Sequence, residues 1–188
     1  MGLLSLEHSK AAYWADFALY GAVIAGLAAY LWLATSAPQQ FAAAVAVLAG
    51  LASWTAIEYA LHRFVLHGLL PFRAWHAEHH ARPTALICAP TVLSGSLIAG
   101  TVFLPLWALA GLVWASAFTL GVLAGYLAYA LTHHAVHHGR HAGPWLLQRK
   151  RWHALHHHAG QQRCYGVTSA FWDRLLGTDG RALPRPAP

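Results

Sequence analysis

The sequence predicts an all-α integral membrane protein in which four transmembrane helices carry a histidine-rich helical cap. Of its 188 residues, 57% are hydrophobic and 10% are charged, whereas a soluble domain has about 25% charged residues. Four apolar runs reach the roughly 20 residues that a helix needs to cross a bilayer. All fifteen histidines except His8 lie in two blocks, at residues 62–80 and 133–158.

The four apolar runs cover residues 13–35, 41–66, 86–108 and 112–136. The first run exceeds the roughly 7 to 15 apolar residues of a signal peptide, so we expect it to remain as a span. Pro105 and Gly111 are predicted to separate the last two runs, because proline ends or kinks a helix and glycine favours a turn. We expect residues 1–188 to form a single membrane domain, with the cap built from residues 67–85 and 137–188.

Basic residues lie on one side of this four-span arrangement. Each of the twelve Lys and Arg residues falls before the first span, at the end of the second, between the second and third, or after the fourth. By the positive-inside rule, both termini and both histidine blocks are expected to be cytoplasmic. The net charge of +6 indicates a membrane surface rather than nucleic acid, because the basic residues form no polar stripe with exposed aromatic side chains. Cys88 and Cys164 belong to no metal-binding pair and are expected to be free thiols.

Two copies of an HxxHH motif place three imidazoles on one face of a helix, because positions i, i+3 and i+4 point along one side. The motifs lie in WHAEHH (75–80) and WHALHHHAG (152–160), and the second span ends in an HxxxxH pair. Together they supply the candidate ligands His62, His67, His76, His79, His80, His153, His156 and His157. His158 points to about the opposite side of its helix, so we expect it to lie outside the set.

The fourth span ends in YALTHHAVHHGRH (129–141) and leaves two alternatives open. His133 and His137 form an i, i+4 pair, whereas His134, His137 and His138 form another HxxHH motif. Spacing alone does not choose between them. For His134, His138 and His158, surface positions or contacts behind the ligands are favoured over ligation.

Eight to ten imidazoles exceed what one tetrahedral ion needs, so two metal ions are predicted. Imidazole suits zinc, copper, iron and nickel alike, and the donor type does not identify the element. A two-metal hydrolase would prefer bridging carboxylates, and the sequence has no DxxD or ExxH motif. Histidines clustered at a membrane surface instead favour oxygen activation and attack on an acyl chain. The lone histidines His8 and His141 are expected to be solvated or to cap helices.

These motifs resemble the fatty acid hydroxylase/sterol desaturase superfamily, and within it most resemble the fatty acid 2-hydroxylase branch. The resemblance rests on EYALHRFVLHG (58–68), WHAEHHARP (75–83), THHAVHH (132–138) and WHALHHHAGQQRCYGVTSAFWDRLLGT (152–178). It implies a four-helix transmembrane base, a cytoplasmic cap with two metal ions, and hydroxylation of a lipid acyl chain with O₂ and electrons. The connection after the second motif, HHARPTALICAP, is short for the family and lacks its acidic residue.

Carried over by position, the family's ligands are the eight candidates above together with His133 and His137, which favours the first alternative in the fourth span. The resemblance implies iron for activity, although zinc can occupy such sites in purified protein. Family members that carry their own cytochrome b5 domain have it before the first span, where few residues stand here. We therefore expect a separate electron donor, either cytochrome b5-like or a ferredoxin.

Several polar residues lie near the predicted ligands. Glu58, one helical turn before His62, and Asp173, beside the closing motif, are each expected to accept the second N–H of a metal-bound histidine. The basic run 149–151 is expected to face anionic headgroups, with docking of an acidic electron carrier or a substrate headgroup as the alternative. A sterol or carotenoid hydroxylase or desaturase of the same superfamily would share the histidines. A non-catalytic metal-binding protein would instead place ionisable residues at mid-membrane, where the spans have almost none.

Overall fold

The computed structural model describes residues 6–140, 143–158 and 162–180. Within these ranges the regular structure is helical, apart from an isolated antiparallel bridge between Glu7 and Ile87. The all-α prediction is therefore confirmed. His141 lies outside the described residues, so its predicted role is not described further.

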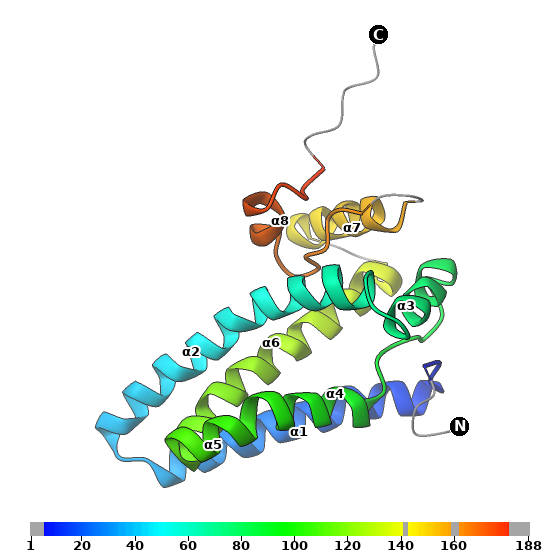
Figure 1. Ribbon diagram of the computed structural model, residues 1–188. Coiled ribbons are helices and arrows are strands. Elements are labelled where there is room, and N and C mark those ends of the chain that lie inside the picture. The colour runs from blue at the N-terminus through cyan, green and yellow to red at the C-terminus, as the bar shows by residue number, and fades with distance from the viewer. Residues whose placement is uncertain (1–5, 141–142, 159–161, 181–188) are drawn as a thin grey trace. The chain divides into compact units, whose positions relative to one another are not determined.

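Four helical runs are long and apolar enough to cross a membrane, as predicted, and Figure 1 labels their helices in chain order. They are α1 (Lys10–Ala34), α2 (Ala37–Ala60) continued by the π-helix η1 (Leu61–Leu66), α4 (Thr91–Ile98) continued by the π-helix η2 (Ala99–Phe103) and α5 (Leu104–Ala110), and α6 (Leu112–His138). Large apolar side chains such as Leu33 and Leu109 are exposed on these runs. A lipid-facing surface has this composition.

The first two spans begin earlier than their apolar runs suggest. Helix α1 starts at Lys10 because the Ser9 hydroxyl caps it, accepting a hydrogen bond from the Ala12 N–H at 3.2 Å. Helix α2 starts at Ala37, four residues before the predicted boundary. Helical hydrogen bonding extends into polar flanking residues, whereas hydropathy marks only the apolar part.

The third span corrects the predicted roles of its prolines. It begins at Thr91, directly after Pro90, rather than at residue 86. Pro105 does not end it, because the helical run continues through this proline to Ala110. Just before it, the chain is π-helical and the Leu104 N–H donates to the Ala99 carbonyl. The break predicted before the fourth span comes from Gly111 alone, whose φ of 86° favours glycine.

The chain divides into two compact units. The first contains residues 1–54 and 85–128, and its small core joins Leu31, Ala43 and Ala117. Its helices α2 and α6 approach closely at glycines. A Cβ at Gly121 would lie 2.0 Å from the Val47 carbonyl oxygen. Close backbone approach at small residues is how membrane helices associate without a hydrophobic driving force.

The second unit contains residues 55–84 and 129–188. Its described elements include the last turns of α2, η1, α3 (Phe72–Ala81), the end of α6, α7 (Pro144–His157) and α8 (Phe171–Leu175). Every described histidine except His8 belongs to this unit. The predicted cap segments are helical in α3, α7 and α8, and they carry eight of the ten candidate ligands, whereas His62 and His133 lie on η1 and α6 outside the predicted cap.

Candidate metal centre

The HxxxxH pair of the second span lies on a π-helix, which sequence reasoning missed. In an α-helix, residues five apart point to different sides because each residue turns by about 100°. In η1, the His67 N–H instead bonds to the His62 carbonyl five residues earlier, at 3.2 Å. This widened turn brings positions five apart over one another. The two imidazoles therefore face the same space, and their ring centroids are 5.3 Å apart.

The ten predicted histidines gather in two clusters of five, each with its ligand nitrogens within 4.8 Å of one another. The first cluster consists of His62, His67, His76, His80 and His156. The second cluster consists of His79, His133, His137, His153 and His157. Both clusters lie within the second unit of the chain.

Each HxxHH motif divides between the clusters, although its three imidazoles were expected to share one face of the helix. In α3, His76 and His80 belong to the first cluster and His79 to the second. In α7 the division is reversed, because His153 and His157 belong to the second cluster and His156 to the first. Positions i and i+4 lie about 40° apart around a helix, while i+3 lies about 60° to the other side of i. Each motif therefore contributes two ligands to one cluster and one to the other.

Nitrogen spacing inside the clusters suits metal ions. In the first cluster, the Nε2 atom of His76 lies 3.0 Å from Nε2 of both His62 and His80. In the second cluster, the His153 and His137 Nε2 atoms are 2.8 Å apart. Neighbouring ligands at right angles around an ion would be about 3 Å apart, since a metal–imidazole bond is about 2.0 to 2.1 Å.

Ring nitrogens without a hydrogen-bond partner also indicate metal binding. Both nitrogens of His157 are buried and have no hydrogen-bond partner among the described residues. A buried polar atom without a partner costs free energy, and a bound cation at the second cluster would supply the partner. Each cluster can therefore hold a metal ion.

Burial holds the cluster histidines in the neutral form. Desolvation lowers the pKa of His80 to about 4, that of His156 to about 3 and that of His157 to about 2. Neighbouring imidazoles lower each of these pKa values further, because two like charges repel one another. At neutral pH the rings therefore offer free lone pairs, which metal binding requires.

Two backbone carbonyls orient rings of the first cluster. The His62 Nδ1 atom lies 2.5 Å from the Tyr165 carbonyl oxygen, and the His156 Nδ1 atom lies 2.8 Å from the Arg163 carbonyl oxygen. Because a carbonyl oxygen only accepts, each Nδ1 carries the hydrogen and donates it. This arrangement leaves both Nε2 lone pairs free to bind metal.

Glu58 holds the segment that carries these carbonyls. Its carboxylate accepts hydrogen bonds from the Val167 N–H at 2.6 Å, the Thr168 N–H at 2.9 Å and the Thr168 hydroxyl at 2.5 Å. We expected Glu58 to accept directly from a ligand histidine. Two of these bonds hold the backbone N–H groups of Val167 and Thr168, and the carbonyl of Tyr165, two residues before Val167, accepts from His62.

Asp173 acts on the same segment from α8. Its side chain is fully buried and accepts from the Tyr165 N–H at 2.9 Å and the Gly166 N–H at 2.8 Å. Gly166 is required here, because a Cβ would lie 1.9 Å from the Ser169 carbonyl oxygen. The motif YGVTSAFWD (165–173) was the sequence signal for this arrangement. Only the structure shows that its backbone N–H groups bind the two carboxylates.

The described histidines that were not predicted as ligands lie outside both clusters. The His134 and His138 rings stack on one another with centroids 4.7 Å apart. His158 is exposed at the C-terminal cap of α7. His8 lies in the first unit, where its backbone N–H donates to the Leu86 carbonyl. The structure thus gathers the i, i+4 pair of the fourth span and leaves the competing histidines aside.

Comparison with known proteins identifies the same family that the motifs resemble. The family model for fatty acid hydroxylase matches residues 47–178, which contain both clusters. The dihydroceramide fatty acyl 2-hydroxylase FAH2 of Arabidopsis thaliana is 35% identical over 144 residues, covering 69% of this chain and 58% of that protein. The ceramide very long chain fatty acid hydroxylase scs7 of Schizosaccharomyces pombe is 32% identical over 164 residues, covering 80% of this chain and 46% of that protein.

A solved structure has the same fold. It is full-length scs7p, in which only the hydroxylase domain is visible, and it matches with a TM-score of 0.75 and 27% identity. The match covers 93% of this chain and 70% of that chain. The two curated relatives are longer proteins, and the matched parts cover 58% and 46% of their lengths.

Proposed function

Because this chain belongs to the fatty acid hydroxylase family, we propose that it is a membrane enzyme that hydroxylates the acyl chain of a fatty acid or lipid with O₂ and external electrons. The observation that carries the proposal is the pair of five-imidazole clusters. Relatives are named for 2-hydroxylation of fatty acyl groups and for ceramides. We extend the reaction and the substrate class to this chain, and propose that carbon 2 of the acyl chain of a ceramide-type lipid is hydroxylated.

The proposed centre holds two metal ions, one in each cluster, with the ten clustered histidines as ligands. Iron is the metal proposed for activity, and zinc is an alternative occupant in purified protein. Bound iron would supply the activation of O₂ and the attack on the acyl C–H bond. The donor set supports this choice, since imidazole binds iron as well as zinc.

The chain's own residues position and shield this centre. Tyr165 and Arg163 hold His62 and His156 in one tautomer through their carbonyl oxygens. Glu58 and the buried Asp173 act as positioning residues, because each binds the segment that presents these carbonyls. Burial of the clustered imidazoles limits the access of water, which favours reaction with the acyl chain over side reactions.

The proposed orientation places both termini and the metal centre on the cytoplasmic side. It is supported by the twelve basic residues, which flank the spans on that side only. Electrons would then come from a separate cytoplasmic donor, cytochrome b5-like or a ferredoxin. A sterol or carotenoid enzyme would use the same donor set, but the relatives named for fatty acyl hydroxylation favour the acyl substrate.

The test compares His156 of α7 with His158, the residue that follows the helix. The chain would be reconstituted with iron, a reducing system and a ceramide, and hydroxylated product and metal content would be measured by mass spectrometry and elemental analysis. We expect about two ions per chain, as ten imidazoles suggest, and product only when O₂ is present. His156→Ala should abolish product and reduce bound metal, because His156 is a buried member of the first cluster.

His158→Ala is the matched control, since His158 is exposed at the end of the same helix. It should retain most of the metal and most of the activity. Product formed without O₂ would contradict the oxygenase proposal. Equal activity of the two variants would show that the first cluster is not catalytic.

A further inference from the structure

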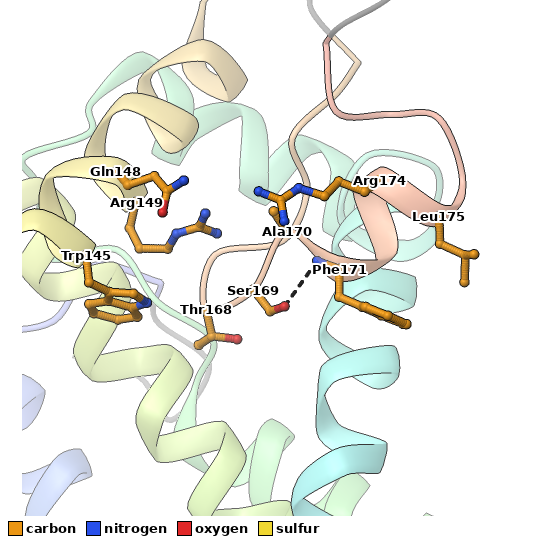
Figure 2. A pocket seen from close by; sticks show the side chains of 9 residues that line it. All are labelled: Trp145, Gln148, Arg149, Thr168, Ser169, Ala170, Phe171, Arg174 and Leu175. Carbon is orange, nitrogen blue, oxygen red and sulfur yellow. Dashed lines mark hydrogen bonds between the residues drawn. The ribbon is translucent and has the colours of Figure 1, made fainter.

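A pocket of about 510 Å³ lies beside α7 and contains none of the ten clustered histidines. Residues of α7, of the segment 168–170 and of α8 line it, and all belong to the second unit (Figure 2). Its polar lining includes Arg149, Arg174 and Gln148. The proposed hydroxylation assigns no role to any of these three side chains.

Arg149 is the unusual member of this lining. Only 4% of its surface is exposed, and its Nε and Nη1 atoms have no hydrogen-bond partner among the described residues. Its guanidinium lies over the ring of Trp152, with 5.5 Å to the centroid. Ring stacking leaves these two N–H donors unsatisfied, and burying an unsatisfied donor of a charged group is costly. An acceptor placed at Nε and Nη1 would offset that cost.

A second guanidinium reaches the same space. Figure 2 shows the side chains of Arg149 and Arg174 extending toward one another from opposite walls of the pocket. Burial lowers the pKa of Arg149 and the positive charge of Arg174 lowers it further, while the carboxylates of Asp173 and Glu58 act in the opposite direction. An anion between the two groups would relieve this repulsion.

The remaining polar lining adds neutral groups and no carboxylate. The hydroxyls of Thr168 and Ser169 and the amide of Gln148 line the pocket, and none of its described lining residues is acidic. Two guanidinium groups present planar forks of N–H donors, which match the oxygen atoms of a phosphate. The lining thus suits a phosphate group better than a cation or a neutral sugar.

The rim of the pocket is apolar. Trp145, Phe171 and Leu175 line it and are 55%, 58% and 61% exposed. In a multi-pass membrane protein, exposed aromatic side chains are typical of the headgroup region of the bilayer. A concave charged site bordered by such residues suits a lipid headgroup better than the broad surface of an acidic electron carrier.

We propose that this pocket binds the phosphate group of an anionic membrane phospholipid, with Arg149 and Arg174 as the phosphate ligands and the apolar rim against the glycerol and first acyl carbons. The lipid is a bound partner and not the acyl substrate. The proposal does not depend on the hydroxylation reaction, so it can be tested independently.

The test is native mass spectrometry of the full chain in detergent, with dioleoylphosphatidylglycerol and dioleoylglycerol as probes. The two lipids share their acyl chains, so the comparison isolates the phosphoglycerol headgroup that carries the phosphate. Wild type should retain the phospholipid preferentially. Arg174→Gln should weaken its binding about tenfold or more, the effect of losing a charge-assisted hydrogen bond. Arg174 is exposed on α8, so this change should leave folding intact.

Arg151→Gln is the matched control, because it removes the same charge from an exposed position on α7 outside the pocket. It should bind the phospholipid like wild type. Arg149→Lys keeps the buried charge but loses the planar fork, and it should also bind more weakly. Equal lipid retention by the Arg174 and Arg151 variants would overturn the proposal.

Two further outcomes would also overturn it. In the first, inorganic phosphate protects wild type against thermal unfolding but does not protect Arg174→Gln, and wild type prefers neither lipid. The pocket would then bind free phosphate. Alternatively, Arg174→Gln could leave lipid binding unchanged while slowing reduction by an acidic donor protein. That result would assign the two arginines to protein docking.

Discussion

Replacing Glu58 tests whether a carboxylate controls the metal centre through the backbone. Glu58→Ala removes the acceptor for the N–H groups of Val167, which is 2% exposed, and Thr168, which is half-buried. Each orphaned buried donor costs about 1 to 3 kcal/mol. We therefore expect the free energy of unfolding to fall by about 1 to 5 kcal/mol, less than the sum of two full penalties because water can reach Thr168.

The same change should weaken the first cluster. Once the segment moves, the Tyr165 carbonyl no longer holds His62, and loss of such a contact behind a ligand typically lowers metal affinity about 10- to 100-fold. Metal retention against a chelator and thermal unfolding in detergent measure the two effects. Glu58→Gln retains an oxygen acceptor and should have smaller effects on both.

Glu78→Ala is the control for removing a glutamate. Glu78 pairs with Arg82 on the surface, where its side chain is 51% exposed, so the change should alter stability by about 0 to 1 kcal/mol. If Glu58→Ala unfolds and releases metal like Glu78→Ala, the positioning role assigned to Glu58 is refuted.

Two other predictions concern protonation and topology. The pKa of His80 is lowered to about 4 and that of His156 to about 3, whereas unfolded histidine has a pKa of about 6.5. The unfolded chain therefore takes up protons that the folded chain does not, and the metal-free protein should lose stability as pH falls from about 6.5 toward 4; a melting temperature constant over this range would contradict the reasoning. Single cysteines at Gln39 and Arg140, with the native cysteines replaced, should react with impermeant reagents from opposite sides of the membrane, and labelling from one side would disprove the four-span orientation.

Local sequence patterns were sufficient to predict the four spans and the candidate metal ligands. Apolar length indicates a membrane helix whatever its neighbours are, so four spans could be predicted from the sequence. Their ends shifted at Ser9 and Pro90, because where a helix begins depends on individual backbone groups and their caps. Histidine spacing likewise indicated metal binding, since the angle between side chains on one helix depends only on their separation.

The sequence by itself determined which imidazoles could serve as ligands, but only the tertiary structure decided which ones meet. His76 and His79 lie on one helix and yet belong to different clusters, because each is completed by histidines from other elements. The π-helical turn at His62 and His67 and the carbonyl of Tyr165 were equally hidden from the sequence. The direction of a side chain follows from local helix geometry, whereas its partner depends on how segments remote in sequence pack together.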